Sequence, residues 1–263
     1  MKKAELNYVK KGKGPVMLLL HGFGFDGTVW DMMLPELSET FTLIIPDMPG
    51  FGNSDLPKDK PLTIDSIADK IDEIIEIEKV KEFTFTGHSM GGYVGLAYLD
   101  KFPQKLNYLA LLNSHAFEDS ADRVGNRKKT LEFIEKYGSR PFIKEFYKTI
   151  FHADFKLNFP EVYDSLLKKS SSIPAESLIC STKAMINRPD RTTVVRKSNV
   201  PLCLILGDQD KFMILEQCAK MAELADFTDF HILKNSGHMG LLEEPTKVSG
   251  ILKKTLNFQK KIH

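Results

Sequence analysis

The stretch of this sequence best suited to chemistry is GHSMGG at residues 87–92, in which three glycines surround Ser89. The strand-forming run Phe83–Thr86 precedes it, and a helical pattern follows it. A Walker phosphate loop needs a lysine where Tyr93 stands, and a dinucleotide fingerprint needs the spacing G-x-G-x-x-G. The spacing therefore excludes both phosphate loops. It leaves G-x-S-x-G, which presents a serine nucleophile on a sharp strand-to-helix turn.

The glycines beside Ser89 have a physical reason. Because Gly87 and Gly91 lack Cβ atoms, they let the backbone approach closely on both sides of the turn. Ser89 then stands at the N-terminus of a helix, where the N–H of Met90 points at the space above the serine oxygen. A serine hydroxyl is a weak nucleophile, so the site also requires a base and a group that orients the base.

Histidine is the expected base, and the chain has seven histidines. His238 sits just beyond a strand pattern, after Gly237, where a side chain can reach the carboxyl edge of a parallel sheet. We expect the side chain of His88 to point away from this base, because it neighbours Ser89 on the turn. The other histidines lie in a strand-end turn, the helical stretch, a strand pattern or the C-terminus: His21, His115, His152, His231 and His263.

The orienting acid has two candidates. The buried-strand run Leu202–Leu206 ends at Gly207, and both Asp208 and Asp210 follow it. Asn113 and Ser114, which follow the preceding strand pattern, cannot carry the charge.

The elements that must position these residues are alternating strands and helices. Continuous apolar runs are typical of parallel strands covered on both faces, and period-3.6 patterns at 64–75 and 245–256 indicate helices. We therefore predict an α/β fold with a doubly wound, mostly parallel sheet. The predicted strands are 16–20, 41–45, 83–86, 106–112, 202–206 and 227–233, with an antiparallel edge strand over 5–10.

The alternation stops between the segments 106–112 and 202–206, where helix-like, aromatic and charged sequence takes over. We predict a core domain of residues 1–114 and 197–263, and a helical cap insertion of residues 115–196 placed after the sixth strand. Most of the aromatic residues of this insertion are expected to pack on the core, and a few to line an apolar pocket. Its aromatic residues include Phe117, Phe133, Phe142, Phe146, Tyr147, Phe151, Phe155, Phe159 and Tyr163.

Arginines of the insertion could bind a substrate carboxylate. For the RPDR stretch at 188–191 we expect exposure to solvent instead. The arginines concerned are Arg123, Arg127, Arg140, Arg188 and Arg191.

Composition limits the partners. The chain has 36 Lys+Arg against 35 Asp+Glu, a balance that argues against nucleic acid or an anionic membrane as a partner. The three cysteines show no paired spacing, and no apolar stretch follows Met1–Lys3, so we expect reduced thiols, no signal peptide and a cytoplasmic location. No H-E-x-x-H or paired Cys/His spacing occurs, so no metal and no cofactor are expected. Nothing in the sequence indicates the oligomeric state.

Taken together, four segments resemble the α/β-hydrolase superfamily, in particular its branch of capped serine esterases and C–C hydrolases. These segments are LLLHGFGFDGTVW (18–30), PDMPGFGNSD (46–55), GHSMGG (87–92), and GDQD (207–210) with NSGHM (235–239). The resemblance implies the α/β-hydrolase fold and a triad in the order Ser, acid, His. It assigns Ser89 as nucleophile, Asp210 as acid and His238 as base, with the backbone N–H groups of Phe23 and Met90 as oxyanion hole.

The resemblance also implies the reaction. We expect a serine hydrolase, a carboxylesterase, that cleaves a small carboxylic ester through an acyl-enzyme without a cofactor. The alternative is a C–C bond hydrolase or lyase of the ring-fission-product or menaquinone-pathway type; a non-catalytic ligand-binding receptor is a third interpretation. Serine at position 89 excludes the haloalkane dehalogenase and epoxide hydrolase branches, which carry Asp there.

Overall fold

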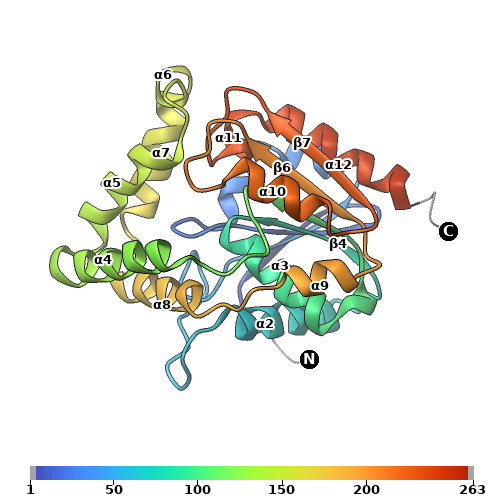
Figure 1. Cartoon of the computed structure of the whole chain (residues 1–263), viewed down its shortest axis with the longest axis horizontal. Helices are drawn as coiled ribbons and strands as arrows, with labels where there is room; N and C mark the ends of the chain where they lie inside the picture. The colour runs from blue at the N-terminus through green and yellow to red at the C-terminus, as the bar shows by residue number, and fades with distance from the viewer. Residues whose placement is uncertain (1–3, 260–263) are drawn as a thin grey trace.

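The computed structural model describes residues 4–259. Two ends of the expected core domain, Met1–Lys3 and residues 260–263 with His263, lie outside the described residues. The centre of the molecule is one seven-stranded sheet in the order β1-β3-β2-β4-β5-β6-β7 (Figure 1). β1 is antiparallel to β3, and the other neighbours are parallel, which confirms the predicted sheet. The strands are β1 (Tyr8–Gly12), β2 (Val16–Leu20), β3 (Thr42–Pro46), β4 (Phe83–His88), β5 (Leu106–Leu112), β6 (Leu202–Gly207) and β7 (Thr228–Leu233).

The edge strand begins later than expected, at Tyr8 instead of residue 5. The backbone of Asn7 is already engaged with the turn after β3: its N–H donates to Ser54 Oγ at 2.9 Å and its carbonyl accepts from Asp47 N–H at 2.9 Å. Pairing of this strand with β3 therefore begins at Tyr8, after Asn7 has bonded to the turn.

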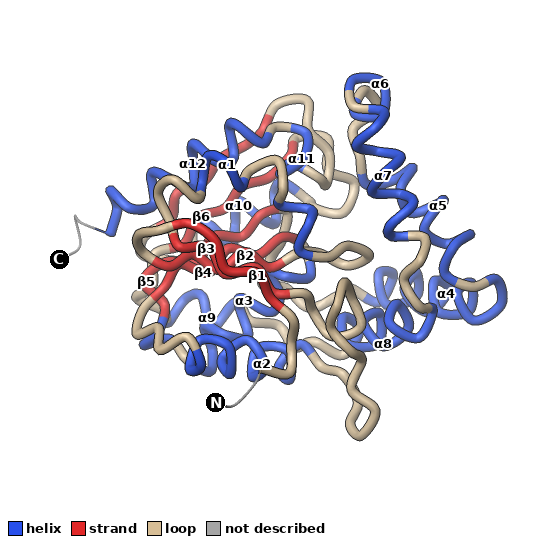
Figure 2. Tube along the Cα trace, turned by 180° about the vertical axis from the view of Figure 1, so that it is seen from behind, coloured by secondary structure: helices blue, strands red, loops and turns tan. Residues whose placement is uncertain are grey.

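Helices cover both faces of the sheet. α2, α3 and α9 lie on one face, and α1 and α12 on the other (Figure 2). α2 begins with a capping box between Thr63 and Ser66, and its isoleucines are buried, as the period of 3.6 predicts. The helices of these layers and their connections are α1 (Leu34–Leu37), α2 (Ile64–Ile77), α3 (Met90–Lys101), α9 (Thr192–Lys197), α10 (Leu215–Ala222), α11 (Gly240–Glu243) and α12 (Pro245–Gln259), with 3-10 turns at Gly27–Trp30 and Pro103–Lys105. Among the helices of residues 4–259, none is long and apolar enough to cross a membrane.

A helical segment leaves the sheet after β5 and returns at β6. It stands beside the layered core, at the left of Figure 1. The expectation that it follows the sixth strand was wrong, because within the described residues one antiparallel strand, β1, precedes β2, which makes β5 the fifth strand. Its helices are α4 (Ala121–Tyr137), α5 (Ser139–Ile150), α6 (Phe155–Asn158), α7 (Pro160–Ser170) and α8 (Ala175–Ile186).

The two ends of this segment are joined by ion pairs. Arg188 Nη2 lies 2.8 Å from Asp119 Oδ1 and 3.0 Å from the Phe117 carbonyl oxygen. Arg191 donates its backbone N–H to Ala116 O at 2.8 Å and its guanidinium to Asp65 on α2 at 2.6 Å. The expected exposure of this stretch was wrong for its two arginines, although Pro189 and Asp190 are exposed. Arg188 and Arg191 are 5% and 4% exposed, because each is bonded where the segment joins the core, a junction that we call the neck.

Replacing Asp119 by Asn should lower the free energy of unfolding at pH 7 by about 3–5 kcal/mol, because the buried Arg188 guanidinium loses its counter-charge. Burial alone would raise the pKa of Asp119, but Arg188 and Arg127 lower it to about 2, below the ordinary aspartate value of about 3.9. The ionised carboxylate therefore stabilises the fold above about pH 4, and this contribution is lost as pH falls toward about 2.

Urea denaturation at several pH values measures this difference. The gap between the wild-type protein and Asp119→Asn should be widest at neutral pH and close on acidification. Glu118→Gln, which removes the same charge from the exposed neighbouring residue, is the control and should have little effect. Equal destabilisation by the two variants would contradict the stabilising role of the Asp119–Arg188 ion pair.

Candidate active site

The turn between β4 and α3 holds Ser89 in a strained backbone conformation, with φ 51° and ψ −114°. The neighbouring glycines are required for close approach: a Cβ on Gly87 would lie 2.4 Å from Gly91 O, and one on Gly91 would lie 2.4 Å from Leu20 O. The N–H of Ser89 donates to Leu112 O on β5 at 2.9 Å. The turn is therefore fixed from both neighbouring strands, as the glycine pattern predicts.

Three of the predicted site residues meet at this turn. Ser89 Oγ lies 2.8 Å from His238 Nε2, and His238 Nδ1 lies 2.8 Å from Asp210 Oδ2. With Asp210 ionised, Nδ1–H donates to the carboxylate and Nε2 is left to accept the serine proton. The serine is partly exposed, whereas the side chain of Asp210 is fully buried.

Asp210 is held from all sides. Its Oδ1 accepts the N–H groups of Phe212 and Met213 at 2.7 and 3.2 Å, and its Oδ2 accepts the amide of Asn113 at 2.8 Å as well as His238. Burial by itself would raise the pKa of Asp210, but His238 and these hydrogen bonds lower it to about 2. The carboxylate is therefore charged at neutral pH.

The second aspartate considered from the sequence differs from Asp210 in its surroundings. Asp208 is exposed, and its Oδ1 accepts the Ser236 N–H at 3.3 Å. Asn113, set aside because an amide carries no charge, instead donates to the acid and to Gly237 O at 3.2 Å. Its place directly after β5 was the signal that could have identified it.

His88 does not point away from the base, contrary to expectation. Its Nε2 lies 2.8 Å from the carbonyl oxygen of His238, and the two imidazole rings are 5.2 Å apart. As the last residue of β4, His88 is covered by the loop that carries His238. Burial lowers the pKa of His88 to about 3, so the ring is neutral and Nε2–H donates to that carbonyl.

The loop that carries His238 is also bonded to the helical segment. The N–H of His238 donates to Ile150 O at 2.8 Å. Glu243 of α11 accepts from Gly237 N–H at 2.6 Å, from Ser236 Oγ at 2.7 Å and from His152 N–H at 2.6 Å. Sequence reasoning missed Glu243, because an acidic residue in a short helical turn carries no motif.

Of the two expected oxyanion donors, Phe23 lies on the loop after β2, and Met90 directly follows Ser89 as the first residue of α3. No hydrogen bond described within residues 4–259 uses the N–H of Phe23 or of Met90 as donor. The Phe23 loop is fixed by His21, whose Nδ1 donates to Gly22 O at 2.9 Å and whose Nε2 accepts from Met48 N–H at 2.8 Å. A Cβ on Gly22 would lie 3.2 Å from Ser89 Cβ, so this loop packs directly against Ser89.

A cavity of about 420 Å³ borders this site. Four phenylalanines line it, namely Phe23, Phe142, Phe146 and Phe212, and the Phe212 ring lies 5.0 Å from the His238 ring. Two of the nine aromatic residues singled out in the sequence thus line a pocket, while Tyr147 and Phe155 are buried in the core. A larger hollow of about 940 Å³ is lined by Val16 and Thr42, at the amino ends of β2 and β3, and so lies away from Ser89.

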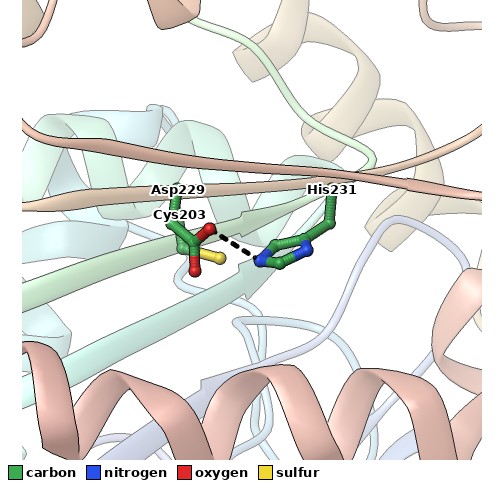
Figure 3. A group of neighbouring side chains, drawn as sticks. All are labelled: Cys203, Asp229 and His231. Atoms are coloured by element: carbon green, nitrogen blue, oxygen red, sulfur yellow. Dashed lines mark ion pairs between the residues drawn. The ribbon is translucent and has the colours of Figure 1, made fainter.

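A group of potential metal ligands lies elsewhere, near the start of β6 (Figure 3). Cys203 pairs with Asp229 across β6 and β7, and His231 shares their face; their ligand atoms lie within 4.8 Å of one another. Strand pairing creates this group, so sequence spacing could not reveal it. Burial and Asp229 raise the pKa of the Cys203 thiol, and His231 Nε2 lies 2.9 Å from Asp229 Oδ1. We assign no metal to it, since a buried thiol beside a carboxylate stays protonated.

Known proteins resemble this chain in sequence. The sequence profile described as the alpha/beta hydrolase fold matches residues 15–245. "Lipase 3" of Moraxella sp. (strain TA144) is 25% identical over 88% of this chain and 73% of its own length. A "2-hydroxy-6-oxo-2,4-heptadienoate hydrolase" of Pseudomonas putida is 23% identical over 91% of this chain and 88% of its own.

Solved structures show the same architecture. A thermophilic esterase from Thermogutta terrifontis, solved with malate bound, superposes with a TM-score of 0.90 at 27% identity and covers 97% of this chain and 93% of its own. Other curated relatives match over a 103-residue stretch that is 30% of their own length.

Replacing Glu243 by Ala should lower the free energy of unfolding by at least about 2 kcal/mol, because the donors on Ser236, Gly237 and His152 lose their acceptor. It should also lower kcat about 10- to 100-fold on any substrate that requires His238, because the loop is held less firmly. Denaturation curves and kcat measured well below the Tm separate the two effects.

Glu243→Gln keeps one acceptor oxygen and should fall between the wild-type protein and Glu243→Ala. Glu244→Ala is the matched control, since the ion pair of the Glu244 side chain within residues 4–259 is with the exposed Lys247. A loss of stability with unchanged kcat would show that Glu243 does not position the His238 loop.

Proposed function

This chain belongs to the alpha/beta hydrolase fold family, and from that premise we propose that it is a serine hydrolase acting on small carboxylic esters. One observation carries the proposal: the continuous hydrogen-bonded chain from Ser89 Oγ through His238 to Asp210, with 2.8 Å at each step. Lipases and esterases among its relatives support the same reaction class.

In the proposed first step, Ser89 Oγ attacks the ester carbonyl while His238 Nε2 takes the serine proton. Asp210 keeps Nδ1–H of His238 oriented and stabilises the imidazolium that forms. The imidazolium then returns its proton to the leaving alcohol, and an acyl group remains on Ser89. Water, deprotonated by His238, releases this acyl group as the acid.

We propose the N–H groups of Phe23 and Met90 as the oxyanion hole. Both are free of other acceptors among the described hydrogen bonds, and Met90 is the first residue of α3, where the helix dipole favours developing negative charge. Preorganised donors of this kind stabilise the tetrahedral intermediate more than the ground state.

Residues 115–196 are proposed to act as a cap over the site, on a core of residues 1–114 and 197–263. The support is the contact of this segment with the reacting groups, through Ile150 O on the His238 N–H and through the phenylalanines of α5 beside Phe23. A cap of this kind excludes water and supplies the walls that select the acyl group.

A second candidate function is hydrolysis of a C–C bond next to a carbonyl, favoured by the similarity to the P. putida hydrolase over 91% of the chain. A panel of esters of increasing acyl length, assayed beside a vinylogous diketone of the ring-fission type, separates the two reactions. A fluorophosphonate probe tests a third interpretation, a binding protein without activity, which would leave Ser89 unlabelled.

Replacing Ser89 by Ala should lower kcat for p-nitrophenyl acetate by about 10⁴–10⁶-fold with little change in Tm, because the hydroxyl serves only the chemistry. The wild-type protein should be labelled by the fluorophosphonate probe and the variant should not. Retention of more than about a hundredth of the activity by Ser89→Ala would contradict the assignment of the nucleophile.

Asp210→Asn should lower kcat by about 10³–10⁴-fold, since the amide no longer holds His238 in the reactive tautomer. Asp208→Asn is the matched control two residues away, and it should change kcat little, because that side chain is exposed and does not contact His238. Steady-state kinetics on the same ester measures both variants. The opposite order of effects would move the acid to Asp208.

A further inference from the structure

The cavity beside the candidate site has two kinds of wall. One wall consists of the phenylalanine rings described above. The other is formed by the first turns of α4, where Arg123 and Arg127 line the cavity. Lys211, which directly follows Asp210, lines it as well. An apolar pocket with a few convergent cations is suited to a ligand with an aliphatic part and an anionic end.

Positive charge exceeds negative charge around this cavity. Arg127 Nε lies 2.5 Å from Asp119 Oδ2, and Arg188 occupies the other oxygen, so the one carboxylate of Asp119 is already shared by two guanidiniums. Arg123 Nε is 3.7 Å from Asp119, too far for a hydrogen bond. Within residues 4–259, Lys211 has no ion pair, and the acidic group that lines the cavity is the exposed Asp122.

His115 orients Arg123 without neutralising it. Its Nε2 lies 3.2 Å from Arg123 Nη1 and accepts a hydrogen bond from it. Burial and the neighbouring Arg188 and Arg123 lower the pKa of His115 to about 3, so the ring adds no charge at neutral pH. The guanidinium of Arg123 is therefore oriented at the cavity wall by an uncharged partner.

We propose that this cavity binds a carboxylate on the substrate, with Arg123 and Lys211 as its specificity-determining residues. The preferred substrates are then esters whose acyl group ends in a second, ionised carboxyl group, with methylene groups packed against the phenylalanine rings. A guanidinium pairs with a carboxylate through two parallel N–H···O bonds, and a partly desolvated site strengthens them. This inference rests on the proposed function for the ester, but the carboxylate site itself does not.

The test compares kcat/KM for two p-nitrophenyl esters of equal shape: the adipate monoester, and its neutral isostere in which an isopropyl group replaces the carboxylate. Adipate is long enough to avoid the rapid self-cleavage of shorter dicarboxylate monoesters. The wild-type protein should prefer the adipate monoester, and the preference should weaken as ionic strength rises.

The ratio of the two kcat/KM values should fall about 10- to 100-fold in Arg123→Gln and by a smaller factor in Lys211→Met. Arg140→Gln is the control: Arg140 is an exposed arginine of α5 outside the cavity lining, and its loss should leave the ratio unchanged. Calorimetric binding of free adipate, a readout independent of hydrolysis, should weaken about tenfold or more in Arg123→Gln.

Two results would overturn the carboxylate site: a wild-type preference for the neutral ester, or the same ratio and the same adipate affinity in Arg123→Gln and Lys211→Met as in the wild-type protein. Failure of the proposed function looks different. Neither ester would be hydrolysed and Ser89 would not react with fluorophosphonate, while adipate binding would still decide the carboxylate site.

Discussion

The structure depends on one close approach of backbone to backbone. The turn after β4 lies so near the carbonyl groups of Leu20 and His21 that no Cβ fits at Gly91. This contact places the N-terminus of α3 directly beside the loop after β2, so that main-chain geometry brings Ser89 close to the proposed amide donors of Phe23 and Met90. In the proposed function, side chains then need only to supply the proton acceptor and its orienting charge.

His238, the proposed proton acceptor, is held between the core and the helical segment. On the core side, His88 donates to the His238 carbonyl, and Asn113 and Asp210 hold the loop and the imidazole. On the other side, Ile150 accepts the His238 N–H. The hydrogen bonds of Glu243 connect both sides. A movement of the helical segment would therefore be transmitted to the imidazole through the backbone and not only through the shape of the pocket.

The sequence predicted most of the features that depend on the backbone, namely the sheet and the turn at Ser89. The alternation of apolar runs predicted the sheet, and the spacing around Ser89 predicted the turn, since both follow from local steric requirements. The geometry brings Ser89, Asp210 and His238 together as the resemblance implied, although their roles stay a proposal. By contrast, the count of strands before the helical segment was wrong, because a family pattern does not state how many edge strands one chain keeps.

What the sequence could not predict was the pairing of polar residues far apart in the chain. Arg188 was expected at the surface, because the RPDR stretch resembles a polar linker. Only the fold brings Asp119 within hydrogen-bond distance of its guanidinium. The contacts of Glu243 and the group formed by Cys203, Asp229 and His231 depend in the same way on strand and loop pairing. Local patterns specify a side chain's chemistry but not its partner.

The neck made by Asp119 and Arg188 has an evolutionary consequence. It joins two residues that are 69 positions apart in the sequence, so the ends of the helical segment stay close together whatever lies between them. Since each doubling of a closed loop adds only about 0.6 kcal/mol of entropy, the helices inside it can lengthen, shorten or diverge with little effect on the sheet. New substrate preferences can therefore arise by drift within α4 to α8 as long as the hydrogen bond from His238 N–H to Ile150 O is kept.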